Sequence, residues 1–190
     1  HASGHSLQSI KTLSHSCLHC AISELESMDS IDINYVRLLA ELYVKNSDWV
    51  ASDQYMSFVL QRYPDDVVLK QLYGRSLVER KQVKKAITVL LQLKPSISRY
   101  PGYYNLIGVA YFQEGYYDIA ERYFSRLTAI YPNVARYWAQ EGFSLNAQRK
   151  YLDAMKALQK AVQIGGMSPE LMNTVQHELG ILSKSLVLTD

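Results

Sequence analysis

The chain has 190 residues, of which 48% are hydrophobic and 20% are charged. These fractions are ordinary for a folded protein and exclude a wholly disordered, collagen-like or low-complexity chain. The formal net charge is +2, so the chain as a whole has no strong electrostatic attraction to nucleic acid. Nine glycines and five prolines are few for an all-β chain of this length, and the composition therefore favours helices.

The first 32 residues contain a polar start and then one amphipathic stretch. Residues 1–6 are small and polar, which is typical of a disordered or tag-like tail. Within residues 7–32, apolar side chains recur at helical spacing, at Ile10, Leu13, Cys17, Ala21 and Leu25. This spacing predicts an N-terminal helix that packs on the first of the elements that follow.

Cys17 and Cys20 are the two cysteines of the chain. Two are too few for a disulfide scaffold, and their spacing on a predicted helix favours buried or partly buried, reduced thiols in an intracellular protein. His15 and His19 suggest a zinc site, but on a helix they share a different face from the cysteines, and we expect no metal. A redox role would need a neighbouring cation to lower a thiol pKa, and the sequence supplies none.

A repeat of 34 residues governs residues 33–168. Small residues recur at this interval, at Gly74, Gly108 and Gly142 and again at Ala86, Ala120 and Ala154. The repeat divides this part into four units, 33–66, 67–100, 101–134 and 135–168. Each unit contains two stretches of helical periodicity, which predicts a helical hairpin. The small residues would let the two helices approach closely, so a bulky replacement should separate them.

The third and fourth units carry a family resemblance. They contain Gly108, Tyr111, Gly115, Tyr117, Ala120, Phe124 and Pro132, then Trp138, Gly142, Tyr151, Ala154 and Ala161. These residues resemble the pattern of the tetratricopeptide repeat (TPR) family, and the resemblance extends more weakly to the first two units. It implies an all-α fold, namely a right-handed α-solenoid of four TPR helical hairpins.

Some positions depart from the family pattern. Lys70 stands where an aromatic residue is usual, and Glu141 stands where an aliphatic residue is usual. Pro95 lies inside the second junction, and Gly165-Gly166 replaces the closing proline of the fourth unit. We therefore expect these two junctions to bend irregularly.

The end of the chain, residues 169–190, predicts a capping helix and a short tail. Ser168 is a good N-cap, Pro169 is favoured at the first helical position, and Glu170 adds an acid to the first turn. An apolar stripe follows at Leu171, Val175, Leu179, Leu182 and Leu186. Such a helix would bury the apolar face of the fourth unit and turn a polar side outward.

Motifs for catalysis are missing from the sequence, which has no glycine-rich phosphate loop, nucleophile elbow or His-Glu-x-x-His pair. We expect no enzyme, no cofactor and no small-molecule substrate. No apolar run reaches about 18 residues, so we expect a cytoplasmic protein without membrane insertion, with a signal or anchor removed before His1 as the alternative. A basic cluster at Arg80, Lys81, Lys84 and Lys85 lacks clustered aromatic stacking residues, which disfavours nucleic acid as a partner.

In proteins that this chain resembles, the first helix of each unit lines a concave face. The resemblance therefore implies a partner-binding groove at Arg37, Gln71, Arg75, Val78, Asn105, Val109, Phe112, Arg136, Phe143 and Asn146. Its apolar members would form a track, and its polar members would bind a peptide backbone or carboxylates. The alternative is that some of these side chains fill the core between repeats. Leu106 stands where chaperone-binding relatives have an amide, so a heat-shock cochaperone role is disfavoured.

Two functions remain as hypotheses. The first is a noncatalytic protein–protein interaction module that binds a peptide or an amphipathic helix, as a chaperone or assembly adaptor. A bacterial secretion or pilus machine is the setting suggested by analogy. The alternative is a structural fragment of a large TPR scaffold subunit that self-associates, for example as a homodimer. Tyrosines expected at exposed ends and turns, Tyr103, Tyr116, Tyr131 and Tyr137, suit such an interface.

Overall fold

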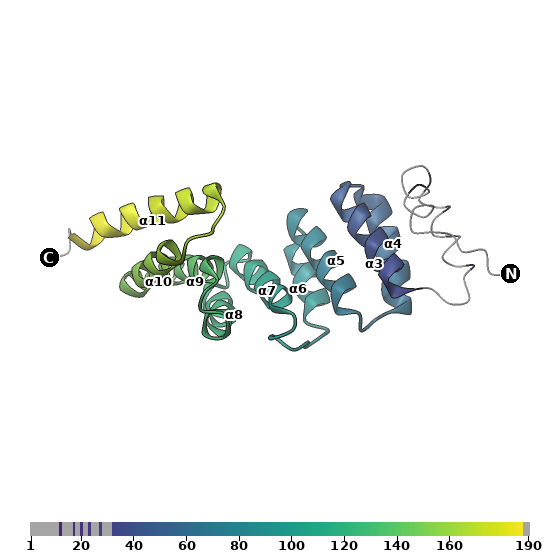
Figure 1. Ribbon diagram of the computed structural model, residues 1–190, viewed down its shortest axis with the longest axis horizontal. Coiled ribbons are helices and arrows are strands. Elements are labelled where there is room, and N and C mark those ends of the chain that lie inside the picture. Colours follow the sequence, from purple (N-terminus) through teal and green to yellow (C-terminus); the bar gives the residue numbers. More distant parts are fainter. Residues whose placement is uncertain are drawn as a thin grey trace. The chain divides into compact units, whose positions relative to one another are not determined.

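The computed structural model describes residues 32–187 and, nearer the N-terminus, residues 12, 17, 20, 23 and 27. The regular elements of these residues are all helices (Figure 1), and the expected all-α helical-repeat fold is confirmed. The expected tail at 1–6 and most of the expected helix at 7–32 lie outside the described residues. The chain forms two compact units, residues 1–76 and residues 77–190.

Short connections join most of the helices, and a longer one, residues 91–100, joins α6 to α7. The first unit contains α3 (Ile33–Lys45), α4 (Trp49–Arg62) and most of α5 (Val67–Glu79). The second unit contains α6 (Val83–Leu90), α7 (Pro101–Gln113), α8 (Tyr117–Ile130), α9 (Ala135–Ala147), α10 (Tyr151–Ile164) and α11 (Pro169–Val187). Helices α3 to α10 fall in pairs within the four ranges that the sequence repeat defines.

In the first unit, α3 packs against α4. Tyr55 on α4 is buried, and its hydroxyl donates a hydrogen bond to the backbone oxygen of Val36 on α3 at 2.9 Å. Nη2 of Arg37 lies 2.6 Å from Oδ2 of Asp66. Oδ1 of Asp66 accepts a hydrogen bond from the backbone N–H of Leu69 at 2.9 Å. This carboxylate therefore ties α3 to the first turn of α5.

In the second unit, two glycines let paired helices approach closely. Helix α7 packs on α8, and α9 packs on α10. A Cβ atom on Gly108 would lie 2.7 Å from Cε1 of Phe124, and a Cβ atom on Gly142 would lie 2.6 Å from Cγ of Leu158. A larger residue at either position would have to displace a buried side chain in the middle of its hairpin. The close approach that the repeated glycines predict is present in both hairpins.

Each hairpin turns at a residue with left-handed backbone geometry. Ser47, Lys81, Gly115 and Arg149 have φ angles of 55°, 62°, 83° and 63°, and they recur at the interval of the sequence repeat. The next residue closes the preceding helix with a backbone hydrogen bond in three cases: Gln82 to Leu77, Tyr116 to Tyr111 and Lys150 to Leu145, at 2.8, 3.0 and 3.0 Å. This bond is typical of a Schellman motif, in which glycine is the residue that fits best.

The junction between α6 and α7 is irregular. Helix α6 has 8 residues, whereas α4, α8 and α10 each have 14. Three tyrosine hydroxyls hold the connecting segment by donating to backbone oxygens: Tyr103 to Leu90, Tyr104 to Pro95 and Tyr131 to Ser98, at 2.6, 2.6 and 2.7 Å. The expectation that Tyr103 is exposed is wrong, because its ring is buried in the core and its hydroxyl is used in this bond.

Helix α11 packs against α10 and completes the second unit. It begins after Ser168, whose Oγ accepts a hydrogen bond from the backbone N–H of Leu171 at 3.3 Å. Val175 and Leu182 are buried in the core that α9 and α10 form. Nδ2 of Asn146 on α9 donates a hydrogen bond to Oε1 of Glu178 on α11. Apolar packing and this polar contact together fix the position of α11.

The two cysteines correct one expectation. Cys17 and Cys20 form a disulfide, and the backbone N–H of Cys20 donates a hydrogen bond to Sγ of Cys17 at 3.1 Å. The expectation of reduced thiols is therefore wrong. Cys17 is partly buried, as expected, whereas Cys20 is exposed. Two cysteines three residues apart can form a disulfide with each other without belonging to a set of disulfides that holds the fold together. Because the cysteines are bonded to each other, they no longer give a reason to expect a reducing compartment.

Candidate functional site

An apolar cavity of about 320 Å³ opens on the second unit. Four helices supply its lining: Val109, Phe112 and Gln113 from α7, Phe124 from α8, Gln140 and Phe143 from α9, and Leu171 from α11. We call it the apolar cavity. Its volume lies at the lower end of the range of about 300–1,000 Å³ that is typical of ligand pockets.

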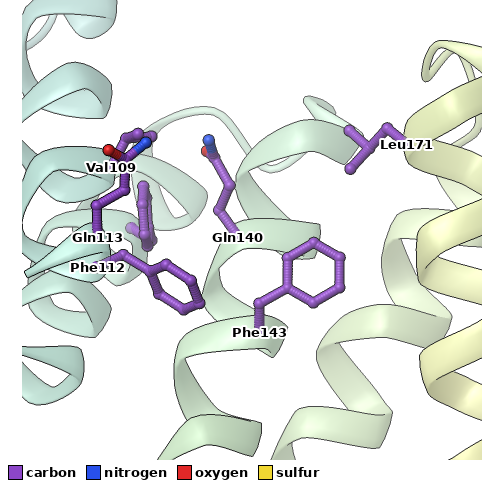
Figure 2. Close-up of a pocket in the computed structure, with 7 residues that line it drawn as sticks. Val109, Phe112, Gln113, Gln140, Phe143 and Leu171 are labelled. Atoms are coloured by element: carbon purple, nitrogen blue, oxygen red, sulfur yellow. The ribbon is translucent and has the colours of Figure 1, made fainter. Parts of the chain in front are cut away.

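Side chains from facing helices shape the apolar cavity. Figure 2 shows Phe112 reaching from α7 toward α9, Gln140 standing between these helices, and Phe143 reaching from α9 toward Leu171. The ring of Phe112 is braced by the ring of Tyr117, with 5.1 Å between their centroids in an edge-to-face arrangement. The walls of the cavity are therefore held by packing before any partner arrives.

A second cavity, of about 430 Å³, is more polar, and we call it the polar cavity. Its lining includes Asn105 of α7, Asn133 and Arg136 around the start of α9, and Gly165-Gly166 after α10. None of the described residues that line it is acidic. Arg136 therefore gives this cavity a positive charge that no lining carboxylate offsets.

The two cavities lie along the same helix faces. The residues that line them are Asn105, Val109 and Phe112 on α7 and Arg136, Gln140 and Phe143 on α9. On both helices the second residue follows the first by four positions, and the third follows by seven, so each series occupies one face. We call the two cavities together the groove. It runs from a cationic end at Arg136 to an apolar end at Phe143.

Among the described residues, no donor contacts the side-chain oxygens of two amides along the groove. Oδ1 of Asn105 and Oε1 of Gln140 are buried and accept no hydrogen bond from the described residues. A buried acceptor without a donor costs about 1–3 kcal/mol.

Five of the ten candidate residues line the groove: Asn105, Val109, Phe112, Arg136 and Phe143. The sequence interpretation missed four others that line the apolar cavity: Gln113, Phe124, Gln140 and Leu171. The spacing of four residues from Arg136 could have identified Gln140. No local pattern could have identified Leu171, because the packing of α11 brings it to the cavity.

The other five candidates have different surroundings: Arg37, Gln71, Arg75, Val78 and Asn146. Arg37 and Asn146 are each bound to a carboxylate of this chain. Gln71 and Arg75 belong to the first unit. Val78 is 6% exposed and lines neither cavity, and its place in a groove stays a prediction. Its side chain fills the core, as the alternative interpretation of these positions anticipates.

The described residues that line the groove are apolar, aromatic or amide residues together with Arg136, and none of them carries a carboxylate. The described side chains whose carboxyl or amine pKa is clearly shifted lie outside both cavities. Burial raises the pKa of Glu141 and lowers the pKa of Lys70, and a backbone hydrogen bond lowers the pKa of Glu170. Among the described residues, no cluster of three or more His, Cys, Asp or Glu side chains is placed to bind a metal. None of the described helices combines the length and the apolar character that crossing a membrane requires.

Similarity to known proteins is found at the level of structure. No protein-family model and no curated protein matches the chain. MamA AMB-1 superposes with a TM-score of 0.65 at 19% sequence identity, covering 83% of this chain and 94% of that chain. MamA 41-end from Desulfovibrio magneticus RS-1 gives a TM-score of 0.64 at 15% identity, covering 81% and 90%.

A third similar solved structure is a TPR domain. The first TPR of Spaghetti (RPAP3), bound to the HSP90 peptide SRMEEVD, gives a TM-score of 0.56 at 17% identity and covers 64% of this chain and 93% of that chain. The chain has a TPR-like fold. In this TPR-like fold the groove follows α7 and α9, the first helices of the third and fourth hairpins, with α11 as a further wall.

Proposed function

We propose that the chain is a noncatalytic protein–protein interaction module that binds a segment of a partner protein in the groove of its second unit. The observation that carries the proposal is the open apolar cavity between Phe112 and Phe143. Apolar surface that a partner covers contributes about 25 cal/mol per Å². Because helices hold these side chains in place, little ordering is needed on binding, and more of this energy remains as affinity.

A chaperone or assembly adaptor is the role that suits such a groove best. Its apolar end can shield an apolar stretch of a partner that would otherwise be exposed to water. A similar solved structure, the first TPR of Spaghetti (RPAP3), holds a peptide. A secretion or pilus machine is a proposed setting that rests on analogy between members of a fold.

A second candidate function is favoured by apolar side chains outside the groove. Leu152 and Tyr151 on α10 are 59% and 41% exposed, and Tyr116 is 52% exposed. Exposed apolar groups of this size are typical of interfaces when they lie together. This candidate is a subunit of a larger TPR scaffold that self-associates. Light scattering across a wide range of protein concentration tests it, since a concentration-dependent mass would support self-association.

Selection from a displayed library of random peptides tests the groove. We expect the unmodified chain to enrich peptides that carry large apolar residues. Phe112→Glu should abolish this enrichment, because it places a charge in the apolar cavity. Phe143→Ser, which removes the other aromatic wall without adding charge, should reduce it strongly.

The matched control is Leu152→Glu, which changes an exposed leucine of α10 to the same acid. It should leave the selection unchanged. Circular dichroism and thermal unfolding of all variants show whether the helices remain intact. Equal enrichment by the unmodified chain and by a folded Phe112→Glu variant would reject the groove as the binding site.

A further inference from the structure

The Cys17–Cys20 disulfide lies outside the groove and lines neither of its cavities. In the chain-entropy model, a disulfide stabilises a fold by closing a loop in the unfolded chain, and the effect decreases as the loop becomes shorter. Cys17 and Cys20 are three residues apart, and neither is fully buried. The bond therefore constrains the unfolded chain only slightly, which leaves its reactivity as the property to explain.

Cys20 is the more accessible residue of the pair. Cys20, Ser23 and Ser27 are all helical and exposed. The intervals between them are three and four residues, which is the spacing of one helix face, and this face meets solvent. Cys17 is not helical and is partly buried. A thiol from solution would therefore reach Sγ of Cys20 more readily than Sγ of Cys17.

The backbone of Cys20 supports Cys17 as the sulfur that leaves when the disulfide opens. The N–H of Cys20 donates a hydrogen bond to Sγ of Cys17 at 3.1 Å. An N-cap side chain makes this contact with the third residue after it. Such a bond is stronger to a thiolate than to a neutral sulfur, so it favours the negative charge that an opened disulfide places on Cys17. The sequence supplies no cation for this role, and the structure supplies a backbone N–H instead.

We propose that the Cys17–Cys20 disulfide is a thiol–disulfide exchange site, at which the thiolate of an external thiol attacks Cys20 and Cys17 leaves. The external sulfur bonds to Sγ of Cys20, the bond between the two cysteines breaks, and its electron pair remains on Sγ of Cys17 as a thiolate. A second external thiolate then attacks the external sulfur of this mixed disulfide, and Cys20 leaves as a thiolate. The two cysteines take up the protons that the two external thiols lost. The chain is reduced by two electrons, and the external thiols are oxidised to one disulfide.

Reduced glutathione is the probe for the order of attack on the full chain. Acid stops the exchange after short times, N-ethylmaleimide blocks the released thiol, and peptide mapping by mass spectrometry shows which cysteine carries glutathione. We expect chains with glutathione on Cys20 and the block on Cys17 to exceed the reverse pattern by about threefold or more, since the hydrogen bond favours Cys17 as the leaving thiolate. Circular dichroism of the same sample shows whether the helices remain folded.

Two single substitutions and an unfolded sample are the controls. Cys17→Ser and Cys20→Ser each keep one thiol, and oxidised glutathione converts them to the two reference products, so both patterns are known to be detectable. Unfolding curves show whether the two variants are folded. In concentrated urea the helix and the hydrogen bond from the N–H of Cys20 are lost, so the preference for Cys20 should fall toward equal amounts of the two patterns.

The outcomes decide the proposal in either direction. Glutathione on Cys20 in the folded chain, with the preference lost in urea, supports it. Equal amounts of the two patterns in the folded chain would overturn it, as would a preference that is the same in urea. A disulfide that stays closed in the folded chain and opens only in urea would also overturn it. The proposal goes beyond the groove, so its failure would leave the proposed function untouched.

Discussion

Thr128 on α8 donates a hydrogen bond from its Oγ1 to Oε2 of Glu141 on α9, at 2.9 Å. Burial raises the pKa of Glu141 above its ordinary value of 4.5, although the bond from Thr128 opposes the rise. A raised pKa in the folded state means that the carboxyl contributes stability below pH 4.5. This contribution is lost as the pH rises through the folded-state pKa.

Glu141→Gln removes this titration and keeps the size of the side chain. We expect the stability of the unmodified chain relative to this variant to be highest near pH 4 and to fall by pH 7. Urea unfolding of both proteins at several pH values measures the difference. A difference that does not change with pH would contradict the assignment of the raised pKa to Glu141.

Gly108→Ala should destabilise the fold although alanine is the better helix former. The new Cβ atom would lie 2.7 Å from Cε1 of Phe124, so the ring or the helix must move. Such overpacking costs about 1–3 kcal/mol of unfolding free energy. Gly180→Ala on α11 is the matched control, because a Cβ atom there meets nothing within 4 Å. It should stabilise the fold by about 0.5–1 kcal/mol. Urea unfolding at neutral pH compares the two.

Tyr103 should make the fold sensitive to alkaline pH. Burial raises the pKa of its hydroxyl from 10.0 to about 12. The folded state therefore keeps this proton between pH 10 and pH 12, where the unfolded state loses it, and stability falls across this window. In Tyr103→Phe, unfolding free energy should fall less steeply over the same range. The variant should also be about 1 kcal/mol less stable at pH 7, since the bond to Leu90 is lost.

The hairpin turns offer a test of backbone strain. Arg149 has a φ of 63°, and the corresponding glycine, Gly115, has a φ of 83°. Because side chains with a Cβ atom disfavour this conformation, Arg149→Gly should raise the melting temperature and Gly115→Ala should lower it. We expect each substitution to change the unfolding free energy by about 1 kcal/mol. A Cβ atom on Gly115 meets nothing within 4 Å, so a loss there reports the backbone alone.

Much of the second unit could be predicted from the sequence because its signals are local. Gly108 and Gly142 each predict the place where a neighbouring helix comes close. The same periodicity places Phe112 and Phe143 on corresponding faces of α7 and α9, where the apolar cavity forms. These inferences need only the helical period and the interval of the sequence repeat.

Contacts between distant parts of the chain could not be predicted in this way. Leu171 reaches the apolar cavity because α11 packs on α10, and Val78 is buried because of its tertiary surroundings. Tyr103 lies two residues after Pro101, in the first turn of α7, where an exposed end residue is expected, yet its ring fills the core and its hydroxyl donates a hydrogen bond to the backbone oxygen of Leu90. Periodicity indicates which face a residue occupies but does not indicate how deeply the neighbouring elements cover that face.

The presence of Leu171 in the lining has a consequence for protein engineering. A single hairpin cannot be copied to reproduce the apolar cavity, because one of its walls comes from α11, which follows the fourth hairpin. Inserting an extra hairpin ahead of α11 would lengthen the molecule and at the same time replace that wall with a new side chain. An insertion at that point would therefore also change the lining of the apolar cavity, and with it the partner that the cavity fits.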